Sequence, residues 1–371
     1  MNSTIDAGRQ MLLALLRASL HDRNPETTFF QNATEKDWRD CYRMAARQGV
    51  MAVAWDAIVK LNAEQQPPKK IKLSWATGVA AYEQNYHRYC ATISELTEFY
   101  ADHGIATMIL KGVGFSTLYP VPSHREGGDI DIYTYSADRT KMSDAEANSL
   151  ANRLIQQQGI KVDTSNYKHS HFHYKRIPIE NHRFFLDTKD YKIAQQVEDI
   201  LKRNMAPQPA TLSGGQVMIP SPAFNSLFII FHAAQHYGAD LTLHQLCDWA
   251  IQIKNFGLNI PEEISDKRFL NGIAAFTHIC NRHLGTSVDV KGGEELAEEI
   301  MNEILSPKYA TDVPVKNKIG ILIYKTKRLI HYHKLKKRIF GDPFIKHIYK
   351  SIIAHLKNPK IIFQRKRDES A

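Results

Sequence analysis

Acidic and apolar residues alternate strictly over residues 129–132 (DIDI), directly after Gly127 and Gly128. A period of two predicts a β-strand, in which successive side chains point to opposite faces. Asp129 and Asp131 then lie on one face of the strand, and the two isoleucines lie on the other and enter a core. The chain around this segment must therefore build a sheet with one apolar face and one face that carries two adjacent carboxylates.

The residues around this strand predict a compact mixed sheet with helices. An apolar run at 106–110 (ATMIL) predicts an earlier strand,. Ser143 and Glu146 form a capping-box pattern that opens a helix ending near Gly159,. Three short strands are expected at 160–162, 171–176 and 183–186. Residues 105–190 thus predict an α+β core.

Helical patterns flank this core on both sides. A long helix is expected from about residue 73 to 103, and two apolar helices are expected at 224–236 and 241–253, with 213–222 as a break before them,. We therefore expect an N-terminal helical region (1–100), a core (101–200) and a C-terminal helical region with a basic tail (201–371). The fold class expected is α+β.

Composition excludes several classes of protein. Apolar residues make up 43% of the chain, which is enough for a globular core,. No stretch approaches the roughly 18 apolar residues of a membrane span, and the first residues lack a secretory signal pattern,. The four cysteines are far apart and form no C-x-x-C pair, which is typical of reduced thiols,. A cytoplasmic protein with no transmembrane segment is expected.

Positive charge is concentrated in the last part of the chain. Residues 316–371 contain 16 Lys and Arg against three Asp and Glu, a net +13, whereas residues 1–315 carry a net −4. Within this part, 325–340 and 346–357 predict amphipathic helices with a basic outer face,. Such a face is either simply solvated or contacts a polyanion or an anionic membrane surface.

Two carboxylates on one strand face repel each other unless a cation lies between them. Asp129 and Asp131 therefore suggest a divalent-cation site, and ligands that are all oxygen suit Mg²⁺,. Gly127 and Gly128 leave room beside them for a phosphate group,. A D-x-D pair alone also occurs on ordinary surface strands, so its sequence context carries much of the inference.

The order of motifs resembles the nucleotidyltransferase superfamily that is built like the palm of DNA polymerase beta. A strand, Lys111-Gly112, a short helix and then an acid–apolar–acid strand follow one another at 109–134. This segment looks like a poorly characterised bacterial branch with L-K-G, Tyr-Pro, Arg and D-h-D in that order. Residues 179–185 (IENHRFF) are similar to its h-E-x-H segment, and 231–250 to its H-x-x-x-H and Leu-x-x-Leu-x-Asp segment.

The resemblance implies a role for each carboxylate. Asp129 and Asp131 would bind Mg²⁺, with two ions expected and Mn²⁺ as an alternative. Glu180, from the h-E-x-H segment, would be the third carboxylate, as a ligand of the second ion or as the acceptor of a proton from the attacking hydroxyl. Asp187 and Asp163 are rival candidates for this third position.

The resemblance also implies the nucleotide-binding residues. Gly112 would let the backbone approach the phosphates, and Lys111 and Arg125 would neutralise charge on the leaving pyrophosphate. The Gly-Ser of the superfamily's first turn is absent, and the span from Gly112 to Asp129 is longer than in compact members. A surface lysine and an ordinary salt bridge are the plain alternatives for the two cations.

Several histidines are further candidates. His182, His232, His236 and Asp248 are candidates to line the active site. His182 shares the strand face of Glu180. The resemblance implies that one or both of His232 and His236 face the site, and a hydrogen-bonded core histidine is the plain alternative. His232 and His236 share a helix face, but HAAQH lacks the glutamate of the H-E-x-x-H metalloprotease motif,. Asp248 is a candidate partner for one of them. His169, His171 and His173 share a strand face, and a metal site or a merely exposed row are both open for them,.

The function implied is metal-dependent transfer of a nucleoside monophosphate from an NTP to an acceptor, with release of pyrophosphate. The acceptor, whether a small molecule, a protein or an RNA end, is not readable from the sequence. A catalytically silent protein that binds a nucleotide or a partner is one alternative. A membrane-associated factor that acts through its basic tail and a histidine-based metalloenzyme are two others.

Overall fold

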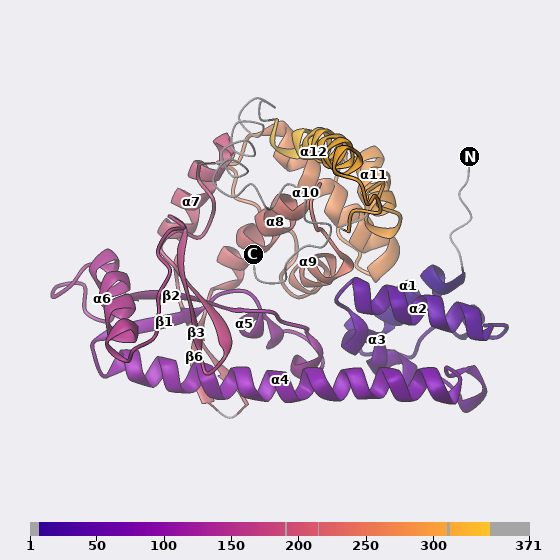
Figure 1. The fold of residues 1–371 in the computed structure, drawn as a ribbon, viewed down its shortest axis with the longest axis horizontal. Coiled ribbons are helices and arrows are strands. Elements are labelled where there is room, and N and C mark those ends of the chain that lie inside the picture. The colour runs from indigo at the N-terminus through magenta and orange to yellow at the C-terminus, as the bar shows by residue number, and fades with distance from the viewer. Residues whose placement is uncertain (1–6, 190, 214, 310–311, 342–371) are drawn as a thin grey trace.

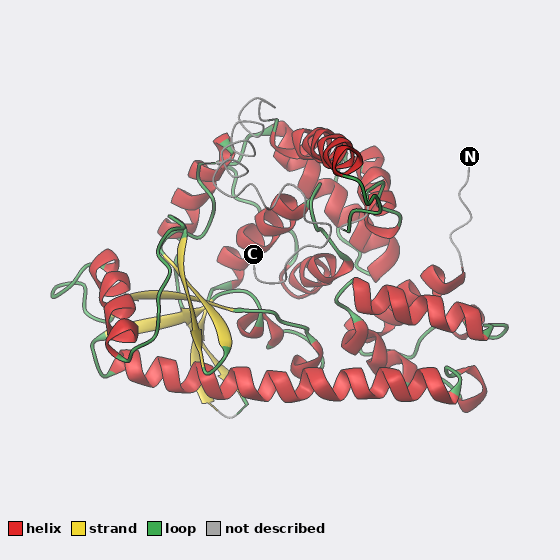
Figure 2. Cartoon of the chain, viewed as in Figure 1, coloured by secondary structure: helices red, strands yellow, loops and turns green. Residues whose placement is uncertain are grey.

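The computed structural model describes residues 7–189, 191–213, 215–309 and 312–341. These residues form an α+β fold, in which a mixed sheet lies among helices from both ends of the chain (Figures 1 and 2). This confirms the fold class expected from the sequence. No helix in these ranges is both long enough and apolar enough to cross a lipid bilayer.

The sheet has six strands in the order β3-β4-β2-β1-β6-β5. They are β1 (Ile105–Ile109), β2 (Ile130–Ser136), β3 (His169–Tyr174), β4 (Ile177–His182), β5 (Gln208–Leu212) and β6 (Gly215–Ile219). The central strand β2 runs antiparallel to β1 and parallel to β4. Strand β1 in turn pairs in parallel with β6. Strand β2, which carries the alternating acids, therefore lies between two other strands.

The strand predictions are right for β1 and β2 and partly wrong afterwards. Residues 160–162 form no strand, and a single bridge joins Asp163 to His171 instead. Residues 183–186 form a bend, because the strand that pairs with β2 ends at His182. The apolar alternation of Ile177 and Ile179 does not continue at Asn181, a fully buried polar residue on the same face. The sequence signal for this strand is therefore weak.

Half of the segment 213–222, predicted as a break between helices, forms strand β6. β5 and β6 form an antiparallel hairpin in which Leu212 pairs with Gly215, and Ser213 takes a positive φ in the turn. A Ser-Gly sequence is typical of tight hairpin turns, so the signal that predicted a break between helices marks the turn between two strands. The sheet consequently continues past residue 200, the end of the core expected from the sequence.

The N-terminal helices are α1 (Ala7–Leu20), α2 (Glu35–Arg47), α3 (Met51–Ile58) and α4 (Lys69–Ala101), with 3₁₀ turns at η1 (Thr27–Phe29) and η2 (Ala63–Gln65). α4 begins directly after Pro67 and Pro68, and the predicted long helix is confirmed,. Figure 1 shows α4 running along one side of the molecule, where it packs against α3 near its start and against β1 and β6 near its end.

The sheet buries its apolar face under two helices. Ile130 and Ile132 of β2 join a core that includes Ile93 of α4 and Ile155 of α6 (Asp144–Gln157). The predicted capping box is present, since Ser143 accepts from the backbone N–H of Glu146 and Glu146 accepts from that of Ser143. The acidic face of β2 is thereby left to face the opposite side of the sheet.

Most of the remaining helices form a group on the side of the molecule away from α4 (Figure 1). The remaining helices are the short α5 (Val113–Ser116), the 3₁₀ turn η3 (Pro122–His124), α7 (Lys192–Arg203), α8 (Pro222–His236), α9 (Leu243–Phe256), α10 (Lys267–Ile279), α11 (Glu294–Leu305) and α12 (Lys318–Phe340), with a π-helical turn η4 (Cys280–Leu284). The apolar α8 and α9 are confirmed close to their predicted bounds. Their core includes Phe231, Trp249 and Phe269, all fully buried.

The basic helix predicted at 325–340 is confirmed as the main part of α12. Leu335, Ile339 and Phe340 are buried, and the Phe340 ring stacks on Tyr191 with centroids 3.9 Å apart. Arg338 forms ion pairs with two glutamates of α11. The second predicted basic helix, 346–357, lies outside the described residues.

Candidate active site

Three carboxylates converge on the polar face of the sheet. Asp131 lies directly opposite Glu180 in the parallel pairing of β2 and β4, so the two side chains share a face. Asp129 precedes the same strand by one residue. One oxygen atom from each of these three carboxylates lies within 4.8 Å of the others. Residues distant in the chain are thus joined by strand pairing into a single acidic cluster.

The two rival acids are engaged elsewhere. The Asp187 carboxylate accepts from the Tyr167 hydroxyl and from the backbone N–H of Lys189. The Asp163 carboxylate accepts from the backbone N–H of Ser165. Neither belongs to the convergent group, which leaves Glu180 as the third carboxylate of the cluster.

Lys111 partly neutralises this cluster. It lies two residues after the end of β1, and its Nζ lies 3.2 Å from Oδ2 of Asp131. Burial would lower the pKa of Lys111, but the charges of Asp131, Asp129 and Glu180 outweigh burial and raise it,. The Lys111 ammonium therefore stays charged at neutral pH and faces the same point as the three carboxylates.

His182 is a second partner of Asp131. Its Nε2 lies 2.9 Å from Oδ1 of Asp131, and its Nδ1 lies 3.1 Å from the carbonyl oxygen of Phe184. Burial would lower the pKa of His182, but hydrogen bonds to Asp131 and Glu180, together with the charge of Asp131, outweigh burial and raise it. The His182 ring is thus held between a carboxylate and the backbone.

Lys111 and His182 affect the three carboxylates differently. Burial would raise the pKa of Asp131, but Lys111 and His182 hold it well below its usual range. Burial would also raise the pKa of Glu180, but the hydrogen bond from His182 and the charges of His169 and His182 together lower it. The pKa of Asp129 is raised, first by the charge of Asp131 and then by burial. Asp129 is thus the carboxylate on which repulsion by Asp131 has the largest effect.

The cluster has the chemistry of a divalent-cation site. All three side chains offer carboxylate oxygens, which are the ligands that Mg²⁺ and Mn²⁺ take in proteins. Oδ2 of Asp131 is a buried oxygen that accepts no hydrogen bond within the described residues, and its ion-pair partner is Lys111. A cation among these oxygens would remove the repulsion that raises the Asp129 pKa. The residues present fit the metal expected from the sequence.

Gly112 occupies a backbone conformation that other residues avoid. Its φ is 63° and its ψ is −127°, and a Cβ there would lie 3.5 Å from the carbonyl oxygen of Asp129. The turn between β1 and α5 therefore needs glycine to bring Lys111 beside the acids.

We expect Gly112→Ala to destabilise the protein by about 1–3 kcal/mol, since alanine is strained at this φ and ψ. Urea unfolding measures the loss. Gly128→Ala is the matched control, because its Cβ would have nothing within 4 Å and its φ is not positive. Equal stability of the two variants would contradict the role given to the Gly112 backbone.

A cavity of about 420 Å³ opens in front of the acids. One wall consists of residues from the β1–β2 connection and β2, and the other of residues from α8 and α9. The lining residues are Tyr82, Lys111, Gly112, Arg125, Glu126, Gly127, Gly128, Asp129, Asp131, His232, His236, His244, Gln245 and Asp248. The cavity thus has a charged sheet wall and a histidine-rich helical wall.

The helical wall includes the predicted histidine pair. The rings of His232 and His236 lie 4.4 Å apart on α8. Burial and then the charge of Lys111 hold the pKa of His232 well below its usual value, so it is neutral. His236 pairs with Asp240 through Nδ1 at 2.6 Å, and not with Asp248. The predicted pairing of Asp248 with one of these two histidines does not occur.

Asp248 instead binds Arg125 in a buried ion pair. Nε and Nη2 of Arg125 lie 3.1 and 2.6 Å from the two carboxylate oxygens, and the Tyr119 hydroxyl donates to the same carboxylate at 2.7 Å. This pair ties the loop before β2 to α9. The salt bridge left open as the plain alternative for Arg125 is present, although Arg125 also lines the cavity.

The structure adds three residues that the sequence analysis did not assign to the acidic cluster or the cavity. His169 of β3 lies beside Glu180, with Nδ1 3.2 Å from Oε2. Lys168, which is half-buried, adds a positive charge that helps lower the pKa of Asp131. His244 of α9 lines the cavity, and burial lowers its pKa to about 4. The strand alternation through 169–173 was the available signal for His169, whereas nothing local marks Lys168 or His244.

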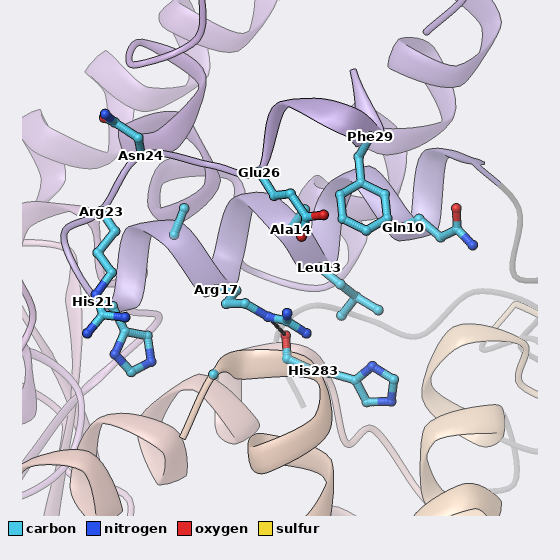
Figure 3. A pocket seen from close by; sticks show the side chains of 12 residues that line it. Gln10, Leu13, Ala14, Arg17, His21, Arg23, Asn24, Glu26, Phe29 and His283 are labelled. Atoms are coloured by element: carbon cyan, nitrogen blue, oxygen red, sulfur yellow. Dashed lines mark hydrogen bonds between the residues drawn. The ribbon is translucent and has the colours of Figure 1, made fainter. Parts of the chain in front are cut away.

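A second, slightly larger cavity of about 460 Å³ lies far from these carboxylates in the chain, between α1 and η4. Figure 3 shows Arg17 reaching across it to the backbone carbonyl of His283, with Phe29 and Leu13 on its apolar side. Its lining contains no group of clustered metal ligands among the described residues. We therefore place the candidate active site in the smaller cavity, beside the acids.

Comparison with known proteins identifies the family. The model of a family described as uncharacterised nucleotidyltransferases matches residues 34–282, and the chain belongs to this family. A solved structure of an antigenic nucleotidyltransferase-like protein from Paracoccidioides brasiliensis matches 54% of this chain and 94% of its own, with 14% identity and a TM-score of 0.37. No curated protein matches this chain.

Proposed function

We propose that this protein transfers a nucleoside monophosphate from an NTP to an acceptor hydroxyl and releases pyrophosphate. The observation that carries the proposal is the convergence of Asp129, Asp131 and Glu180 within 4.8 Å, beside a cavity. A divalent cation held by these oxygens would neutralise phosphate charge and orient the reacting groups. Membership of a nucleotidyltransferase family supports the class of reaction. The proposal names no particular acceptor.

The residues of the chain supply positioning and charge. Lys111 places a positive charge in the turn between β1 and α5, beside the cavity, where it would attract the phosphates of an NTP,. Gly112, Gly127 and Gly128 present no side chains to the cavity, which leaves space for the triphosphate. His182 fixes Asp131 through its hydrogen bond, so the carboxylate keeps its orientation before a substrate arrives,.

The helical wall is the side on which we place the acceptor. His232, His236 and His244 face the sheet wall across the cavity and offer ring nitrogens to a hydroxylated molecule. His232 is neutral and can therefore accept a hydrogen bond from a hydroxyl group,. α12 carries many lysines and arginines, which favours a polyanionic binding partner,.

Incubation of the purified chain with each α-labelled NTP and Mg²⁺ tests the proposal. We expect label to pass to an acceptor supplied by a cell extract, and the double variant Asp129→Ala, Asp131→Ala to transfer none. Binding of each NTP is measured in parallel by isothermal titration. Tight binding without transfer by the wild-type protein would contradict the proposal and support a silent nucleotide-binding protein.

A further inference from the structure

We propose that the site holds two chemically different cations: a hard one on Asp129, Asp131 and Glu180, and a transition-metal dication on Glu180, His169 and His182. The inference rests on the proposed function in one respect, since both positions share Glu180 with the catalytic cluster. His169, Glu180 and His182 form a second group in which one ligand atom from each lies within 4.8 Å of the others.

The spacing of these atoms fits a common metal ion. Oε2 of Glu180 lies 3.2 Å from Nδ1 of His169 and 3.5 Å from Nε2 of His182. Two ligands about 2.1 Å from a tetrahedral zinc ion lie about 3.4 Å apart. Ligand atoms around one ion direct their lone pairs at the ion rather than at each other. Nδ1 of His169 indeed lacks a hydrogen-bond partner among the described residues, although it is buried beside a carboxylate.

Hydrogen bonds outside the ligand set orient the two rings. The Nδ1–H of His182 donates to the Phe184 carbonyl, and a metal on Nε2 would take the place of the proton between this nitrogen and Asp131,. Nε2 of His169 lies 3.3 Å from the exposed amide nitrogen of Asn166. With a metal on Nδ1, Nε2 carries the proton, and the Asn166 amide has to turn its oxygen toward the ring.

The ligand types decide which cation each position takes. Neutral imidazole suits Zn²⁺, Co²⁺ and other first-row transition ions, whereas carboxylates alone suit Mg²⁺. Three protein ligands also leave a fourth position open, as in catalytic rather than structural zinc sites. Oδ1 of Asp131, which lies 2.9 Å from Nε2 of His182, is a further oxygen beside this position. Glu180 would bridge the two positions.

Cobalt(II) absorption spectroscopy tests this inference without any nucleotide. The full chain is stripped of metal with a chelator and titrated with Co²⁺. We expect one tightly bound Co²⁺ with the visible bands of a nitrogen-containing site of low coordination number. His169→Ala should weaken this binding at least tenfold and change the bands, since loss of even a supporting contact costs 10–100-fold in metal affinity. His169→Gln serves in its place if the alanine variant does not fold.

Two further variants make the outcome decisive. His173→Ala is the matched control, because His173 lies on the same face of β3 but is exposed and outside the cluster. Asp129→Ala should keep the Co²⁺ bands while it loses nucleotidyl transfer. Unchanged bands and affinity in the His169 variants, or the weak bands of an octahedral oxygen-only site in the wild type, would overturn the inference. Transfer with Mg²⁺ would then still support the proposed function.

Discussion

Asp131→Asn is expected to lower kcat/KM for nucleotidyl transfer by about a thousandfold or more, since metal-ion catalysis supplies several kcal/mol and each 1.36 kcal/mol is tenfold in rate. Asp131 contacts Lys111 and His182 and belongs to the group of three acids. Asparagine keeps the shape but removes the charge, so it cannot hold a cation against the phosphates. The measurement is steady-state transfer with the labelled NTP that the wild type uses.

Two neighbouring carboxylates provide the control for Asp131→Asn. Asp163→Asn and Asp187→Asn remove the same charge from residues that bind the backbone elsewhere. Both variants are expected to keep transfer within about twofold of the wild type, because neither residue reaches the cluster,. Retention of a tenth or more of the wild-type kcat/KM by Asp131→Asn would show that the reaction does not depend on this carboxylate.

Arg125→Ala is expected to lower the free energy of unfolding by about 3–5 kcal/mol, since it leaves a buried carboxylate without its cation. The side chains of Arg125 and Asp248 are only 6% and 7% exposed, so solvent replaces the lost partner poorly. The Tyr119 hydroxyl still donates to Asp248, and Nε2 of His244 lies 4.0 Å from its Oδ2. Urea unfolding followed by circular dichroism gives the value.

A double variant separates this buried charge from simple loss of packing. Arg125→Met with Asp248→Leu removes both charges and keeps apolar volume, and replacements of this kind are often neutral or stabilising. We expect it to recover most of the stability that Arg125→Ala loses. A loss below about 1 kcal/mol in Arg125→Ala would mean that the ion pair is not buried in solution as it is in the structure.

The acidic strand could be predicted because its signal is local. Alternation over 129–132 fixes both the strand and the face on which Asp129 and Asp131 lie, and the capping box at Ser143 fixes the start of α6,. Glu180 was assigned by resemblance alone. Its position is explained by the parallel pairing of β2 and β4, a long-range contact that no local pattern encodes.

The parts that sequence reasoning missed depend on contacts between distant segments. The sequence of the β5–β6 hairpin has little apolar alternation. The hairpin joins the sheet because β6 pairs with β1,. Asp248 was expected beside the α8 histidines, but Arg125 lies closer in space. The proximity of His169 to Glu180 likewise arises from β3 pairing with β4. Charge partners of this kind become visible only in three dimensions.

The late entry of β6 into the sheet has a consequence for dissecting the chain. β6 comes from beyond α7, yet it pairs with β1, the strand that leads to Lys111. A fragment that stops near residue 200 would leave β1 as a bare edge, open to pairing with another molecule. The smallest autonomous unit that retains the carboxylates therefore has to include the hairpin, and α8 and α9 if it is to retain both walls of the cavity.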